Sequence, residues 1–121
     1  MTLQECYTKL EGDYTGVLAR LMREASIAKF LVMMLKDTQL EEFHKGLENS
    51  DFETAFRAVH TLKGTALNLG ITKLALDAST VTEALRGGDP KTDITDMVTE
   101  LEDEYYKTMR VITEFNETKE N

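Results

Sequence analysis

Hydrophobic residues recur every three or four positions along most of the chain, which is the spacing of amphipathic helices. The clearest stretch predicts a helix over residues 51–69. Its apolar positions are Phe52, Ala55, Phe56, Val59, Leu62, Ala66 and Leu69. Ser50, followed three residues later by Glu53, is typical of a capping box, and Gly70 is suited to end the helix. This stretch is therefore expected to turn one face toward a core.

The same spacing predicts the remaining elements. Residues 27–47 indicate a helix that bends near Asp37–Thr38, residues 71–86 a second, and residues from about 93 to 115 a third. Two shorter helices are expected at residues 3–10 and 14–22, and no stretch shows the alternation of a strand. We expect an all-α, up-down-up-down antiparallel four-helix bundle over residues 26–115. Residues 1–25 would add one or two short helices, and the polar tail 116–121 would be frayed.

Composition narrows the class of protein. A chain of 121 residues is sufficient for one domain. Its net charge of −8 argues against nucleic-acid binding, which depends on Lys and Arg, and suits a monomer that meets other proteins briefly. No apolar run is long enough to span a membrane, and the N-terminus lacks the features of a signal peptide. The single cysteine, Cys6, excludes an internal disulfide, so we expect a cytoplasmic protein.

The chain has two histidines, which are the first candidates for chemistry. His44 follows Glu41 in a Glu-x-x-His pair, which di-iron bundles use in two copies together with further carboxylates. The second copy is missing, so no metal site is expected and His44 is interpreted as a solvated surface residue.

His60 lies on the edge of the apolar face of its predicted helix. Gly64, Leu67 and Ile71 follow at steps of four, three and four, and so continue the stripe on which His60 lies. An imidazole in this place can pack on one side and face solvent on the other. The position of His60 alone is also consistent with a histidine that packs at the edge of the core and has no chemical role.

Two neighbours of His60 favour a chemical role. Lys63, one turn on, would disfavour imidazolium, leave a nitrogen lone pair free, and offset the charge of an attached phosphoryl group. Gly64 costs about 1 kcal/mol relative to Ala inside a helix, and no turn is needed there. It removes side-chain bulk where a partner would approach, although close helix packing would also explain a glycine.

The stretch from Ala58 to Gly70 resembles the signature of histidine-phosphotransfer (HPt) domains: a histidine, a hydrophobic residue two positions on, Lys-Gly, small residues, and a final hydrophobic-Gly pair. The matching residues are His60, Leu62, Lys63, Gly64, Ala66, Leu69 and Gly70. Weaker resemblance to small stand-alone bacterial HPt proteins extends over nearly the whole chain.

The resemblance implies that His60 accepts a phosphoryl group, through Nε2, from a phosphoaspartate on a receiver domain and passes it to another receiver. It implies docking around Gly64, Leu67 and Ile71, Mg²⁺ supplied by the receiver, and no cofactor of the chain's own. The sequence also lacks the glycine-rich motifs of ATP-binding enzymes. A phosphocarrier is therefore expected, and an enzyme is not.

Two positions depart from the family pattern. Leu67 stands where a smaller residue is common, and Thr82 where the next helix often carries a glutamate. Two other interpretations remain open: a helical adaptor in which His60 is incidental, and the phosphoacceptor module of a larger chemotaxis-type kinase. Met1 and the lack of a trailing linker favour a complete small protein.

Overall fold

The computed structural model describes residues 1–119, and helices make up most of them. The helices among these residues are α1 (Leu3–Leu10), α2 (Tyr14–Leu21), α3 (Glu24–Met34), α4 (Gln39–Glu48), α5 (Phe52–Asn68), α6 (Thr72–Leu85) and α7 (Thr95–Thr118). No strand occurs in the described part, so the predicted all-α class is confirmed. None of these helices is both long enough and apolar enough to cross a membrane.

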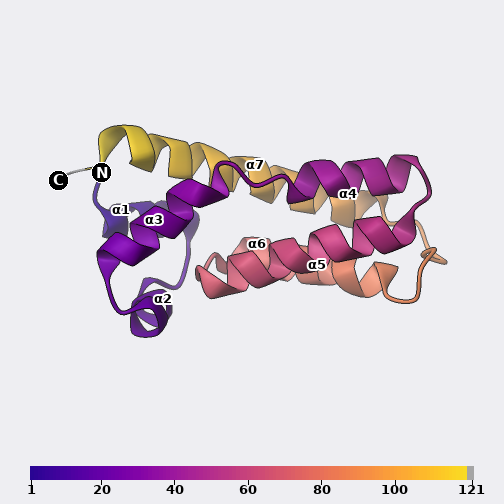
Figure 1. Ribbon diagram of the computed structural model, residues 1–121, viewed down its shortest axis with the longest axis horizontal. Helices are drawn as coiled ribbons and strands as arrows, with labels where there is room; N and C mark the ends of the chain where they lie inside the picture. Colours follow the sequence, from indigo (N-terminus) through magenta and orange to yellow (C-terminus); the bar gives the residue numbers. More distant parts are fainter. Residues whose placement is uncertain (120–121) are drawn as a thin grey trace.

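The four helices α4 to α7 lie along one another in the larger part of the molecule, and α1, α2 and α3 gather at one end (Figure 1). Helix α5 packs closely against α4 and α6 on either side of it, and α6 also packs against α7. Their apolar faces meet in a common core. Its largest fully buried side chains are Tyr7, Phe43, Ile27, Leu31, Leu62, Ile71, Leu74, Leu85, Leu101, Ile112, Val17 and Val59.

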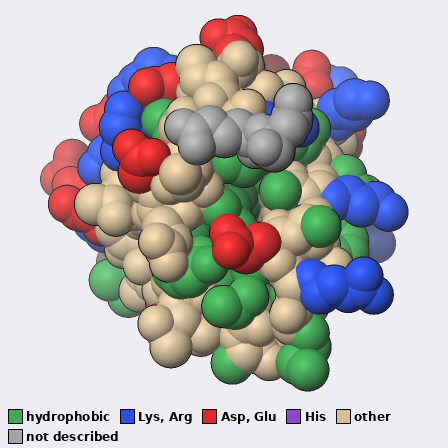
Figure 2. Space-filling view, turned by 90° about the vertical axis from the view of Figure 1, so that its left-hand side faces the viewer, with side chains coloured by type: hydrophobic (Ala, Val, Ile, Leu, Met, Phe, Trp, Pro, Cys, Tyr) green, Lys and Arg blue, Asp and Glu red, His purple; other side chains and the backbone are tan. Residues whose placement is uncertain are grey.

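The end formed by α1, α2 and α3 exposes hydrophobic side chains. Figure 2 looks onto this end and shows them between margins that carry acidic and basic groups. Met22, just after α2, and Phe30 and Met33 of α3 are among the exposed large hydrophobic residues. The short N-terminal helices therefore leave part of their apolar surface uncovered.

The predicted helix over residues 27–47 is wrong as a single element, because the structure has two separate helices there, α3 and α4, joined by a short non-helical segment. The backbone N–H groups of residues 35–37 bond to the carbonyls of residues 32–34, three positions back. These tighter bonds end the α-helical ladder, and a new helix starts at Gln39. The expected bend near Asp37–Thr38 is a joint between two helices.

The start of α5 also differs from the expectation. Asp51 caps the helix, with its carboxylate accepting hydrogen bonds from the Thr54 backbone N–H (3.2 Å) and hydroxyl (2.7 Å). Ser50, the predicted cap, adopts φ 54° and belongs to the turn that ends α4. The loop is so short that one turn closes α4 and opens α5, which moves the cap by one residue. Glu53 pairs weakly with Arg57 at 3.8 Å instead of forming a capping box.

The end of α5 is held by the N-terminal segment. The Tyr7 hydroxyl donates to the carbonyl of residue 69 (2.6 Å), and Arg20 Nη2 donates to those of residues 67 (3.0 Å) and 68 (3.1 Å). Gly70, at φ 69°, forms the turn that ends the helix, and its carbonyl accepts from the Asp13 N–H (2.8 Å). These bonds satisfy carbonyls that a helix terminus leaves open. The predicted role of Gly70 is thus confirmed.

The last helix extends beyond the predicted end. Residues 116–118 are helical, although they were expected to be frayed. The buried Phe115 anchors this turn, and the Met1 ammonium donates to the carbonyl of Thr118 (2.7 Å). A positive charge at this end also interacts favourably with the helix dipole. The rest of the predicted tail, residues 120–121, lies outside the described residues.

Candidate functional site

His60 lies at the middle of α5, and its side chain is exposed. Val59 and Leu62, on the inner side of the same turn, are buried in the core. The backbone beneath the imidazole is therefore fixed by packing, while the ring itself faces outward. This is the border position that the hydrophobic spacing predicts.

The imidazole packs against an aromatic ring one turn earlier. The ring centroids of Phe56 and His60 are 5.7 Å apart, and the two planes are inclined by only 4°. At the C-terminal end of α6, the guanidinium carbon of Arg86 lies 5.3 Å from the centroid of the Phe56 ring. Arg86 Nε and Nη2 in turn donate to the two carboxylate oxygens of Glu83, at 3.0 and 2.9 Å. Phe56 thus contacts the imidazole directly, and Arg86 and Glu83 contact it only through Phe56.

Charges near His60 come from both helices. Hydrogen bonds from Arg86 hold the pKa of Glu83 below its usual range, and the charges of Arg86, Lys63 and His60 act in the same direction. Lys63 is half-buried one turn beyond His60. Arg86, bonded to both carboxylate oxygens, therefore compensates the negative charge of Glu83.

The surface beyond His60 is open. A Cβ added to Gly64 would meet no heavy atom within 4 Å outside its own helix backbone, so this glycine does not serve helix packing. The side chain of Leu67 is 54% exposed, and that of Leu76 on α6 is 61% exposed. Gly64 thus leaves open space one turn beyond the imidazole, and Leu67 exposes an apolar side chain further along the same helix.

Comparison with known families identifies this arrangement. The sequence model of the Hpt domain family matches residues 28–109, from α3 through most of α7. The chain belongs to the Hpt domain family. Hpt domains are phosphocarriers of two-component phosphorelays and interact with receiver domains. Comparisons with curated proteins and with solved structures gave no match.

One predicted docking residue of this Hpt domain is placed wrongly by the sequence. Ile71 is fully buried and cannot contact a partner. The prediction extended the stripe of His60, Gly64 and Leu67 by one more helical step. However, α5 ends at Asn68, and Ile71 follows the turn at Gly70 and caps α6. The periodicity therefore no longer applies at this position.

Thr82, the second departure from the Hpt pattern, is also buried. Its hydroxyl donates to the carbonyl of Ala78 within α6 (2.7 Å), so it is satisfied inside its own helix. Its neighbour Glu83 is exposed on the side of α6 near His60. The exposed acidic residue on this part of α6 is therefore Glu83, one position after Thr82.

The other histidine of the Hpt domain is not the solvated surface residue that was expected. His44 is half-buried on α4, and its Nε2 is hydrogen-bonded to Glu102 Oε2 on α7 at 2.7 Å. The prediction failed because Glu102 is 58 residues away in the sequence. Within residues 1–119, no cluster of three or more potential metal-ligating side chains occurs. His44 links two helices.

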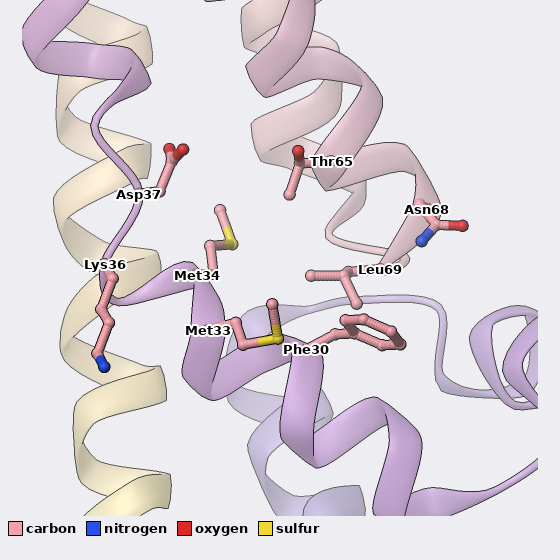
Figure 3. A pocket seen from close by; sticks show the side chains of 8 residues that line it. All are labelled: Phe30, Met33, Met34, Lys36, Asp37, Thr65, Asn68 and Leu69. Carbon is pink, nitrogen blue, oxygen red and sulfur yellow. The ribbon is translucent and has the colours of Figure 1, made fainter.

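A pocket of about 300 Å³ lies between α3 and the end of α5 (Figure 3). It is lined by Phe30, Met33, Met34, Lys36, Asp37, Thr65, Asn68 and Leu69. Asp37 and Thr65 face each other across it, whereas Lys36 points away. Asp37 Oδ2 is buried without a hydrogen-bond partner among the described residues. Burial raises the pKa of Asp37, although backbone hydrogen bonds from Gln39 and Thr38 oppose this.

The sequence did not reveal three members of the Hpt site: Phe56, Glu83 and Arg86. Phe56 was assigned only to the apolar face, although its place four residues before His60 was a usable signal. Glu83 and Arg86 are three residues apart, as an ion pair on one helix would be. Their approach to His60 depends on how α5 and α6 align, which no local pattern encodes.

Proposed function

We propose that this Hpt protein carries a phosphoryl group on His60 between receiver domains. The observation that supports this most directly is an exposed imidazole followed by Lys63 and by Gly64, around which space is open. The buried side chains of α5 hold this helix in place, so a partner meets a rigid surface. In this proposal α4 to α7 form an antiparallel up-down-up-down bundle, and the protein works as a cytoplasmic monomer.

The proposed reaction is a transfer between a carboxylate and an imidazole. A lone pair of the neutral His60 ring, on Nε2, attacks the phosphorus of a phosphoaspartate on the receiver domain. The bond between phosphorus and the aspartyl oxygen breaks, and the carboxylate leaves with its electron pair. The reverse reaction loads the aspartate of a second receiver. Mg²⁺ bound by the receiver would stabilise the charge on the phosphoryl group in both directions.

Docking would use the open surface beyond His60. Gly64 lets the receiver approach the imidazole closely, and Leu67, with Leu76 of α6, offers exposed apolar side chains for contact. Because both leucines are more than half exposed in the free protein, covering them would stabilise a complex. Ile71, being buried, has no part in this surface.

The proposal is tested by incubating the protein with a receiver domain carrying ³²P-phosphoaspartate. We expect an acid-labile label on the protein, because phosphohistidine hydrolyses in acid. His60→Gln should abolish the label, and His44→Gln, which removes the other histidine, should retain it. A label that persists in the His60→Gln variant would assign the phosphate to another residue. An unlabelled, folded wild-type protein that still binds receivers would favour a non-phosphorylated adaptor.

A further inference from the structure

The stack on His60 joins two helices. Phe56 lies parallel to the imidazole at 5.7 Å between centroids. Arg86, the residue that follows α6, lies over the Phe56 ring at 5.3 Å, and two hydrogen bonds to Glu83 fix its guanidinium. Helical side chains tilt toward the preceding turn, so a residue four positions before His60 is the one that its ring meets. Phe56 is therefore placed to restrict the movement of the imidazole.

We propose that Phe56, braced by Arg86 and Glu83, is a positioning residue that holds the imidazole of His60 in the orientation from which it accepts the phosphoryl group. This inference rests on the function proposed above for His60. Parallel rings whose centroids are 5.7 Å apart are offset, so Phe56 packs against part of the imidazole and the two nitrogens on the ring edge stay accessible. The nucleophilic atom is thus oriented without being blocked.

The need for such a residue follows from the exposure of His60. An exposed histidine on a helix samples about two χ1 wells, each with two broad χ2 orientations. About one of these four would direct a given ring nitrogen at the partner. Restricting the ring to that orientation before the receiver arrives raises the reactive population by at most about fourfold.

Arg86 and Glu83 explain why Phe56 itself stays in place. Phe56 is only half-buried, so packing by its own helix leaves part of the ring free. A guanidinium over an aromatic face is an attractive contact, and the bidentate pair with Glu83 restricts the arginine. In the same pair, the positive charge of Arg86 compensates the Glu83 carboxylate, which would otherwise repel an incoming phosphoryl group. The brace therefore supports both the orientation and the charge balance at His60.

The test compares Phe56→Leu with Phe52→Leu, a matched control one turn earlier on α5, where Phe52 is also half-buried. Transfer from a phosphorylated receiver is followed over a range of receiver concentrations, which separates the maximal rate from the apparent affinity. For Phe56→Leu we expect a maximal rate lower by about two- to fourfold, with unchanged affinity. Phe52→Leu should match the wild type, and Phe56→Tyr should restore the rate.

A second pair of measurements excludes a merely structural effect. Nitrogen-15 spectra and χ1 couplings of His60 should show several ring orientations in Phe56→Leu and one in the wild type. The double variant Glu83→Gln, Arg86→Gln removes the brace without changing the net charge, and should show a smaller loss in the same direction. Rates are expressed per folded molecule from melting curves, so that loss of fold is not counted.

The outcomes separate this inference from the proposed function. If wild-type His60 is labelled and Phe56→Leu transfers at an unchanged maximal rate, the positioning role is wrong. A change in affinity alone would make Phe56 part of the docking surface and would also overturn the inference. If the wild type is not labelled on His60, it is the proposed function that fails. A slower maximal rate with a mobile His60 ring supports the inference.

Discussion

Two glycines inside helices of this protein have opposite surroundings. A Cβ on Gly46 in α4 would lie 2.7 Å from the backbone N of Ala55 and 2.9 Å from the carbonyl oxygen of Asp51. The same atom on Gly64 would meet nothing within 4 Å. The first glycine is required by close packing of α4 on α5. The second has no packing reason, which leaves access to His60 as its explanation.

Substitutions at the two glycines should therefore act in opposite directions. Gly64→Ala should stabilise the protein by about 0.5–1 kcal/mol, because alanine favours the helix and has room. Gly46→Ala should cost about 1–3 kcal/mol, because the methyl group would press on a backbone. Gly64→Gln should keep the fold but slow transfer more than Gly64→Ala, by obstructing the receiver. Thermal melts and transfer time courses measure these effects, and full transfer in Gly64→Gln would contradict the docking role.

Lys63 supplies the cation one turn beyond His60 on α5. If it offsets the charge of the phosphoryl group, Lys63→Ala should slow transfer about fivefold, which corresponds to about 1 kcal/mol for a charge pair at 4 Å in water. Lys63→Glu should be slower still, because it opposes the phosphoryl group with a second carboxylate near Glu83. Lys45→Ala, at an exposed position on α4, is the control. Equal rates for all the variants would remove Lys63 from the site.

At the scale of elements, the joint between α3 and α4 contains a buried polar group. Asp37 lies in this joint, and its Oδ2 has no hydrogen-bond partner in the described structure. Burial raises the pKa of its carboxyl group. A raised pKa means that the folded protein disfavours the charged form more than the unfolded chain does. At neutral pH, the ionised carboxylate of Asp37 therefore makes the fold less stable than a neutral carboxyl at the same place would.

The raised pKa of Asp37 leads to a prediction for the Asp37→Asn variant. The asparagine oxygen can still accept the backbone hydrogen bonds of Thr38 and Gln39, and the penalty for a buried charge disappears. We expect a higher melting temperature than wild type at pH 7. The advantage should shrink as the pH falls through the raised pKa of Asp37, because the wild-type carboxyl then becomes neutral as well. A variant less stable than wild type at pH 7 would show that the carboxylate has a stabilising partner.

At the scale of the whole molecule, a few polar contacts join segments that are far apart in sequence. His44 and Glu102 connect α4 to α7, and Tyr7 and Arg20 hold the carbonyls that end α5. The N-terminal helices thus support the helix that carries His60 from its C-terminal end. These contacts add to a core that already links all the helices.

A double-mutant cycle on His44 and Glu102 measures one of these contacts. Both side chains are about one-third exposed, so their coupling should resemble that of a surface pair, about 0.2–1 kcal/mol. His44→Ala and Glu102→Ala should each lower the melting temperature by a few degrees at most, and the double variant should lose less than the sum. Asp103→Ala, at the exposed next position, serves as the control. Strictly additive losses would mean that the bond contributes nothing to stability.

The sequence by itself determined the helices and the candidate phosphosite, because both depend on the spacing of residues that are close together in the sequence. The period of apolar residues fixes which side of a helix is buried, and His60, Lys63 and Gly64 lie within two turns of α5. The exposed positions of His60 and Gly64 agree with that period. The helix ends were predicted less well, since Asp51 instead of Ser50 caps α5 where two helices share one short turn.

Only the tertiary structure decided how the helices meet. The stripe through His60 predicted Ile71 on the surface, but the chain turns at Gly70 and buries it. Arg86, with Glu83, reaches the Phe56 ring beside His60 because α5 and α6 pack side by side, and His44 bonds to Glu102 because α4 approaches α7. Such contacts depend on the alignment of whole helices. That alignment results from the sum of many core contacts, so no local motif records it.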